Sequence, residues 1–311
     1  RDDFDCAIVS VPDQLHFEVT APLLRRGLHS LVVKPLTPTL AEARQLCSLQ
    51  RQAGVYGAVE FHKRFDEANL LVRRMVDEGE LGRLSYATVQ YSQRREVPLE
   101  HFVKWARETD VFQYLGVHYV DLLYHLTGFR PRRAMGCGSY GVLGAEGLEA
   151  YDAVHATVEW ERPDAPDDAP FVSQFAVGWI DPNDSSAASD QRYCLVGSAG
   201  RVDCDQKHRG VELVAGRGAQ SINPYFSQFL SHGAGQRFAG YGPESVQRFL
   251  EDVTALGARR TTLEALDATR PTLADALVST AVIEAVSASL AQEGRWMPVE
   301  DATMDDLEPS P

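Results

Sequence analysis

Apolar and polar positions repeat with two different periods along the chain, and the change of period divides it into two parts. The first part contains three continuous apolar runs, at residues 6–11, 30–33 and 55–61. Runs of this kind are typical of strands buried on both faces. Helical patterns at residues 15–26 and 39–53 separate them. Strand and helix in this alternation predict a right-handed βαβ array on a parallel sheet.

After a helix expected at residues 66–77, the pattern becomes a strict alternation of polar and apolar positions. It predicts strands at 84–93, 152–160 and 171–180, and shorter strand candidates lie at 132–137, 192–196, 201–204 and 211–214. Alternation of this kind is typical of an antiparallel sheet with one solvated face. Further helices are expected at 111–126, 243–256 and 271–291. The predicted fold class is therefore α/β plus α+β, with helices on one face of the second sheet.

Composition narrows the function classes. A chain of 311 residues favours two domains. Its net charge of −14 argues against nucleic-acid or anionic-membrane partners, and no apolar run approaches the roughly 20 residues that span a bilayer. The five cysteines are scattered and form no C-x-x-C pair, which favours a reduced, intracellular protein. We recognise no signal peptide at the start of the sequence and therefore expect a cytoplasmic location.

A glycine pattern at residues 136–141 matches the dinucleotide fingerprint G-x-G-x-x-G. That fingerprint requires a buried parallel strand before it and a helix after it. Here it lies among alternating strands, so we interpret it as strand-end and loop glycines.

The chain contains, in this order, D-C-A-I-V-S-V-P-D-Q-L-H (5–16), G-L-H-S-L-V-V-K-P (27–35), F-H-K-R-F (61–65), E-G-E-L-G (78–82), G-V-H-Y-V-D-L-L (116–123) and R-W (295–296). Together these segments resemble the Gfo/Idh/MocA family of sugar and cyclitol oxidoreductases. The resemblance implies a truncated Rossmann domain at residues 1–62 and a substrate and oligomerisation domain with a large open sheet at 63–311. Residues 5–11 resemble the fourth Rossmann strand, so about 60 residues with the glycine-rich loop would precede them.

The resemblance implies NAD or NADP as cofactor. The residues expected against it are Ser10, Val11, Pro12, His16, Lys34 and Pro35. For His16, an ordinary helix-start histidine is an equally good interpretation.

Lys34 is the strongest catalytic candidate. The bare sequence would make it an ordinary lysine at a strand end, but K-P here resembles the family's catalytic lysine, a general base for the hydroxyl being oxidised. That role requires its pKa to fall by roughly 3 units from about 10.4. Val33 stands where the family usually has glutamate, which puts one contact to the cofactor in question.

Tyr114, His118, Asp121 and His125 are spaced to share one face of the expected helix. The resemblance implies that His118 bonds the reacting hydroxyl and helps to move its proton. Tyr114 stands where the family often has aspartate and is the third catalytic candidate. Asp121 is expected to orient neighbours, and His125 to be a core histidine. The spacing is not H-E-x-x-H, so no metal is expected.

His62, Arg64, Asp121, Trp179 and Asp181 are the candidates for substrate contact, although a surface arginine and solvated turns explain several of them almost as well. The predicted activity is NAD(P)-dependent interconversion of a secondary alcohol and a ketone on a sugar, sugar derivative or cyclitol. Two alternatives stay open: a non-catalytic sugar or nucleotide sensor, and an NAD-dependent glycosidase. A homodimer or homotetramer formed through the open sheet is expected.

Overall fold

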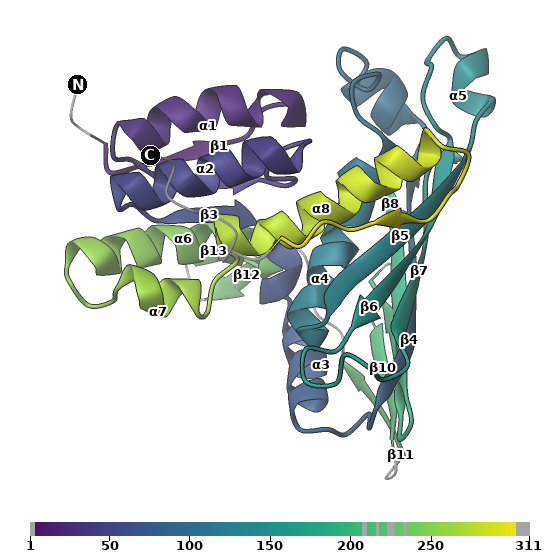
Figure 1. Cartoon of the computed structure of the whole chain (residues 1–311). Coiled ribbons are helices and arrows are strands. Elements are labelled where there is room, and N and C mark those ends of the chain that lie inside the picture. Colours follow the sequence, from purple (N-terminus) through teal and green to yellow (C-terminus); the bar gives the residue numbers. More distant parts are fainter. Residues whose placement is uncertain (1–3, 207–209, 216–217, 223–227, 233–234, 303–311) are drawn as a thin grey trace. The chain divides into compact units, whose positions relative to one another are not determined.

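The computed structural model describes residues 4–206, 210–215, 218–222, 228–232 and 235–302. They belong to two compact units, drawn in Figure 1 and described separately below. The first unit holds the described residues within 1–66, 225–281 and 301–311, and the second those within 67–224 and 282–300. The predicted division at residues 62 and 63 lies near the first of these boundaries, whereas the return of residues 225–281 to the first unit was not predicted.

The first unit contains a parallel sheet of order β1-β2-β3, formed by Cys6–Val9, His29–Val33 and Gly57–Glu60. Helices α1 (His16–Arg25) and α2 (Leu40–Ala53) connect the strands. Helix α2 begins at Thr39, whose hydroxyl accepts from the backbone N–H of Glu42, and ends at Gly54 with φ of 62°. The predicted βαβ array is therefore confirmed. Burial on both faces is not met for the first run, because β1 is an edge strand of the described sheet and Ile8 is 47% exposed.

The second contribution to this unit comes from much later in the chain. It comprises β12 (Gln228–His232), β13 (Gly235–Ala239), α6 (Tyr241–Gly257), α7 (Leu263–Asp267) and the beginning of α8 (Leu273–Leu290). In Figure 1, α6 and α7 lie on the side of the parallel strands away from α1 and α2. Phe249 of α6 stacks on Tyr56 with ring centroids 5.5 Å apart, within a cluster that also buries Leu31. The backbone N–H of Val59 donates to the carbonyl of Pro271 at 2.8 Å.

Among the described residues, the second unit is built on a nine-stranded sheet of order β11-β10-β9-β8-β4-β7-β6-β5-β14. The strands are β4 (Leu84–Arg94), β5 (Arg130–Ser139), β6 (Ala153–Glu161), β7 (Phe171–Asp181), β8 (Ser189–Gly197), β9 (Arg201–Asp205), β10 (Gly210–Ala215), β11 (Gly218–Ile222) and β14 (Met297–Pro298). All neighbours pair antiparallel except β4 and β7, which are parallel. The expected antiparallel sheet is confirmed with this one exception, which the alternation could not predict, because alternation reports which face is buried and not the direction of the neighbouring strand.

Helices α3 (Glu67–Asp77) and α4 (Val117–Thr127) lie on one face of this sheet, as predicted (Figure 1). Tyr193 of β8 donates to the side chain of Asn69 on α3 at 2.8 Å. The opposite face presents exposed polar side chains, including Gln90, Gln174 and Arg192. Helix α8 is long and apolar enough to cross a membrane by composition alone, but 67% of it is buried, as in a core helix.

The segment before α4 is a π-helix, Phe112–Gly116, instead of the first turn of one long α-helix. Two local contacts explain it. The carboxylate of Asp110 accepts from the backbone N–H groups of Phe112 and Gln113, and a Cβ on Gly116 would lie 2.6 Å from the Phe112 ring. A π-helical turn contains more residues than an α-helical turn, so Tyr114 does not have the α-helical spacing from His118 that the prediction assumed. Of the four residues predicted to share one helical face, only His118, Asp121 and His125 lie on α4. Such π-helical turns are frequent at functional sites.

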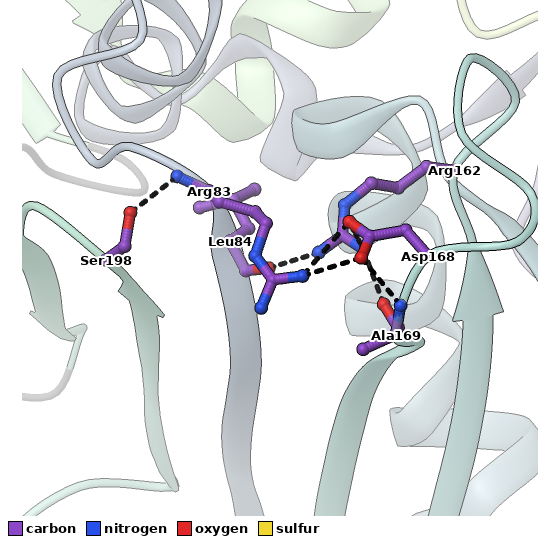
Figure 2. Close-up of polar contacts among 6 residues, drawn as sticks. All are labelled: Arg83, Leu84, Arg162, Asp168, Ala169 and Ser198. Atoms are coloured by element: carbon purple, nitrogen blue, oxygen red, sulfur yellow. Dashed lines mark hydrogen bonds and ion pairs between the residues drawn. The ribbon is translucent and has the colours of Figure 1, made fainter.

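A buried arginine fixes the loop between β6 and β7 (Figure 2). Arg162 is 8% exposed and donates to the carbonyl oxygens of Leu84 and Ala169 and to the carboxylate of Asp168. The exposed Arg83 contacts the same carboxylate at 2.9 Å. The loop is therefore tied to the start of β4 by one guanidinium with several acceptors.

The glycines of the fingerprint-like segment lie on β5 and in the turn after it. A Cβ on Gly138 would meet the ring of Tyr151 at 2.3 Å, and Gly141 has φ of 134°. The structure confirms that these glycines lie on an antiparallel strand and in the turn after it, although a short helix that was not expected, α5 (Val142–Ala145), follows Gly141.

Candidate active site

The carboxyl ends of β1 and β2 bring most of the predicted cofactor residues together. Ser10, Val11 and Pro12 follow β1, and Lys34 and Pro35, joined by a cis peptide bond, follow β2. Parallel sheets in α/β folds bind their ligands at this edge.

His16, at the start of α1, connects the two loops. Its Nδ1 lies 2.7 Å from the carbonyl oxygen of Pro35, and its Nε2 lies 3.0 Å from that of Val11. Burial lowers the pKa of His16, although the two carbonyls and Asp13 act in the opposite direction. Because a neutral imidazole carries one N–H, it donates to one of the two carbonyls at a time. The structure thus gives this histidine a part in fixing the loop geometry.

Lys34 is 8% exposed. Burial lowers the pKa of its amine to about 8, while the carboxylates of Asp13 and Glu60 favour the ammonium form. Asp13 lies in the 3-10 turn after β1, and Glu60 ends β3 opposite Val33. Neither carboxylate was singled out from the sequence. Their position at the last residue of β3 and in the turn that follows β1 was the available signal, because the carboxyl ends of parallel strands share one edge of the sheet.

Glu60 belongs to a group of four side chains from β3, the turn after it and α6. The hydroxyl of Ser245 donates to its Oε1 at 2.6 Å. Nδ1 of His62 lies 3.1 and 3.0 Å from the two carboxylate oxygens. The ring of His62 stacks on that of Tyr241 at 5.7 Å. His62, a predicted substrate contact, therefore lies beside the carboxylate that acts on Lys34.

Arg64 is an internal residue of the first unit and not a surface arginine. Its guanidinium donates to the carboxylate of Asp275 at 2.7 Å and lies 5.7 Å from the centre of the Phe61 ring. This ion pair holds the turn after β3 against the start of α8.

The second unit holds the other two predicted catalytic residues, His118 and Tyr114, and the substrate candidate Asp121. His118 and Asp121, both on α4, are 4% and 1% exposed. The ring of His118 lies 6.0 Å from that of Tyr91 on β4. Tyr114, in the π-helix, packs among aromatic rings: those of Phe102, Trp105 and Trp179 lie 4.9, 5.9 and 5.7 Å away.

Trp179 and Asp181 lie at the end of β7. Trp179 is fully buried, and within the described residues its indole N–H has no hydrogen-bond partner. Asp181 accepts from the hydroxyl of Ser92 at 2.6 Å, and its carbonyl accepts from the backbone of Arg95 at 3.0 Å. Asp181 thus fixes the end of β4, in addition to any contact with a substrate. The part of the chain that the structure describes holds no group of three metal-ligating side chains.

Comparison with known families identifies the chain. Residues 1–61 match the sequence model of an oxidoreductase family with an NAD-binding Rossmann fold, and residues 69–203 match that of the GFO/IDH/MocA C-terminal domain. The protein therefore belongs to the Gfo/Idh/MocA family of oxidoreductases, with the two family domains in the order in which the two sheets occur.

Several curated proteins are similar to part of the chain. The scyllo-inositol 2-dehydrogenase (NADP(+)) IolW of Bacillus subtilis is 28% identical over 159 residues, which cover 51% of this chain and 43% of that protein. The 1,5-anhydro-D-fructose reductase of Ensifer adhaerens is 32% identical over 153 residues, 47% of this chain and 45% of that protein. The matched segment thus spans less than half the length of either relative.

Solved structures share the fold along nearly the whole chain. An inositol dehydrogenase homolog from Azotobacter vinelandii, complexed with NADH and myo-inositol, superposes with a TM-score of 0.78 at 19% identity, covering 96% of this chain and 79% of that one. A levoglucosan dehydrogenase complexed with NADH and levoglucosan gives 0.76 at 16% identity, covering 97% and 81%. At these identities the likeness establishes the fold.

Proposed function

We propose that the protein is an NAD(P)-dependent oxidoreductase that interconverts a secondary alcohol and a ketone on a sugar, sugar derivative or cyclitol. The observation that carries this proposal is Lys34, an amine buried at the carboxyl end of β2 with its pKa lowered to about 8. A general base works best when its pKa lies near the working pH. Family membership supplies the redox chemistry to which such a base belongs.

The residues present fit the nicotinamide end of NAD or NADP. The loop with Ser10, Val11 and Pro12 lies at the carboxyl edge of the sheet, where such ligands bind, and His16 holds it to Pro35. These residues, with Lys34 and Pro35, would contact the cofactor. When bound, the cofactor supplies or accepts the hydride, and the protein supplies orientation and acid–base chemistry.

In the oxidation direction, the neutral amine of Lys34 removes the proton from the substrate hydroxyl. In the reduction direction, its ammonium returns that proton to the carbonyl oxygen. His118 would hydrogen-bond the same oxygen, and the Tyr114 phenol would donate to a neighbouring sugar oxygen. A phenol stands where the family often has a carboxylate, and a phenol is neutral at pH 7, so the proton relay through Tyr114 would differ from the one usual in the family.

The substrate class follows from relatives that, by name, act on scyllo-inositol, 1,5-anhydro-D-fructose and D-glucosides. All are rings with several secondary hydroxyls. We propose a substrate of this class, contacted by His62, Arg64, Asp121, Trp179 and Asp181. We further propose a cytoplasmic homodimer or homotetramer in which the open face of the large sheet is covered. That face has a hollow of about 700 Å³ lined by polar residues such as His155 and Arg192.

Nicotinamide fluorescence tests the proposal. NADH and NADPH are titrated into the full-length protein, and a panel of polyols and pyranosides is then screened for NAD(P)⁺ reduction with the parent and with Lys34→Met. Cofactor binding with turnover in the parent alone supports the proposal. Cofactor binding without turnover on any substrate would favour a sensor, and release of reducing sugar without net NADH would favour a glycosidase. Absence of binding at millimolar cofactor would contradict the assignment.

A further inference from the structure

Glu60 and His62 form a hydrogen-bonded pair at the carboxyl end of β3. Nδ1 of His62 lies 3.1 Å from Oε1 of Glu60 and 3.0 Å from Oε2. The side chains of His62 and Glu60 are 18% and 14% exposed. An ionised carboxylate can only accept hydrogen bonds, so Nδ1 carries the hydrogen that lies between the two groups. The contact therefore determines which ring nitrogen of His62 is protonated.

Residues of α6 contact both members of this pair. The ring of Tyr241, the first residue of α6, stacks on the His62 imidazole with the centroids 5.7 Å apart and 29° between the planes. The Ser245 hydroxyl lies 2.6 Å from Oε1 of Glu60 and 2.8 Å from the carbonyl oxygen of Gly242. Its single hydrogen serves one of these two acceptors at a time. The orientation of His62 thus depends on Glu60 and Tyr241, and Ser245 is not required for it.

The hydrogen on Nδ1 fixes the chemistry of the other ring nitrogen. In a neutral imidazole one nitrogen donates and the other accepts, so Nε2 of His62 carries the lone pair. The hydrogen bond made by one ring nitrogen sets the role of the other in this way at many histidine sites. Glu60 therefore makes Nε2 of the neutral His62 ring a hydrogen-bond acceptor.

We propose that Glu60 is a positioning residue for His62: it holds the imidazole as the Nδ1–H tautomer, and Nε2 thereby accepts a hydrogen bond from a hydroxyl group of the substrate. His62 directly follows the end of β3, and the carboxyl edge of a parallel sheet is where α/β folds bind ligands. The tautomer is a property of the protein alone. Only its use in substrate binding rests on the proposed function.

An acceptor at this position selects among substrates. A sugar or cyclitol hydroxyl can donate its hydrogen to Nε2, whereas an ether or ketone oxygen in the same place cannot. A site built to bond a hydroxyl disfavours an analogue without one, because the polar group of the site then loses its partner. We therefore expect His62 to favour substrates with a free hydroxyl on the carbon that faces it.

NMR of protein labelled with ¹⁵N-histidine identifies the tautomer, because protonated and unprotonated ring nitrogens have well-separated chemical shifts. The sequence has nine histidines, and His62→Gln assigns the signals of His62. Spectra are recorded at a pH above which these signals no longer change, so that the ring is neutral. Glu60→Leu is the test variant, since leucine offers no acceptor to Nδ1. Glu244→Gln is the matched control, because Glu244 lies on α6 but pairs with Arg248 at 2.8 Å.

The proposal expects the Nδ1–H tautomer in the parent and in Glu244→Gln. In Glu60→Leu it expects a shift toward the Nε2–H tautomer, which histidine favours in water. A parent protein with the Nε2–H tautomer overturns the proposal, and this result does not depend on whether Glu60→Leu folds. A folded Glu60→Leu protein that keeps the parent tautomer also overturns it.

Kinetics test the use of Nε2 in binding. For whichever of scyllo-inositol, myo-inositol and methyl glucoside the parent oxidises, KM should rise about 3- to 10-fold in Glu60→Leu, with a smaller change in kcat. A changed tautomer with an unchanged KM overturns the role of Nε2 as acceptor. The Nδ1–H tautomer in a parent without NAD(P)-dependent turnover supports the effect of Glu60 on His62 and refutes the proposed function. Turnover by a parent with the Nε2–H tautomer does the reverse.

Discussion

Burial of Lys34 lowers the stability of the folded protein and at the same time lowers the pKa of the amine toward the range that suits a general base. Its ammonium loses hydration on folding, and the two nearby carboxylates restore only part of that loss, so the pKa falls from 10.5 to about 8. Between these values the unfolded chain binds more protons than the folded chain. The stability of the folded protein therefore rises with pH from about 8 to 10.5 and carries the full penalty below pH 8.

We therefore predict that Lys34→Met is more stable than the parent at pH 7, by about 3 kcal/mol at most. The difference should shrink as the pH rises from 8 to 10.5. Urea unfolding of both proteins across that range measures it. If Lys34→Met were less stable than the parent at pH 7, burial of the Lys34 ammonium would not lower the unfolding free energy of the parent, contrary to this prediction.

His16 should matter for stability as well as for the cofactor loop. His16→Ala removes the ring that contacts the carbonyls of Val11 and Pro35 and leaves a buried gap beside them. We expect a loss of about 2–3 kcal/mol in unfolding free energy. His101→Ala, at an exposed histidine outside the proposed sites, is the control and should change it by less than about 0.5 kcal/mol. Equal effects of the two substitutions would contradict this role.

At the scale of elements, the sequence predicts the helices and strands well where periodicity is strong, and fails where a local contact overrides it. Strands are observed where apolar runs predicted them, as β1, β2 and β3, and where alternation predicted them, as β4, β6 and β7. The π-helix before α4 cannot be predicted from the period of the apolar positions. It depends on the hydrogen bond from the backbone N–H of Phe112 to the carboxylate of Asp110 and on the close approach of the Phe112 ring to Gly116.

The loop between β6 and β7 offers an element-scale test with a matched pair (Figure 2). Arg162→Met leaves the carbonyl of buried Leu84 without this donor and also removes the hydrogen bond to the carbonyl of exposed Ala169, and we expect a loss of about 2–3 kcal/mol. Arg83→Met removes an exposed ion pair to the same Asp168 and should cost less than about 1 kcal/mol. Thermal or urea unfolding compares the two. A larger loss for Arg83→Met would contradict the importance of the buried guanidinium.

At the scale of the whole molecule, the function of particular residues could be predicted from the resemblance to the family but not from the pattern of apolar and polar positions. Pattern alone gives two sheets of different kinds but leaves Lys34 an ordinary strand-end lysine. It also misses the return of residues 225–281 to the first unit, because packing of Phe249 on Tyr56 joins residues distant in sequence. Glu60 and Ser245 were missed for the same reason, since their contact joins β3 to α6.

The most direct test of the central claim is the pH profile of kcat/KM for NAD(P)⁺-dependent oxidation of a polyol substrate, compared in the parent and in Lys34→Met. The profile of the parent should rise with pH and level off above an inflection near 8, because the neutral amine is the base. Lys34→Met should lose roughly 10²-fold or more in kcat/KM while still binding NADH. A Lys34→Met enzyme within twofold of the parent at every pH would contradict the account.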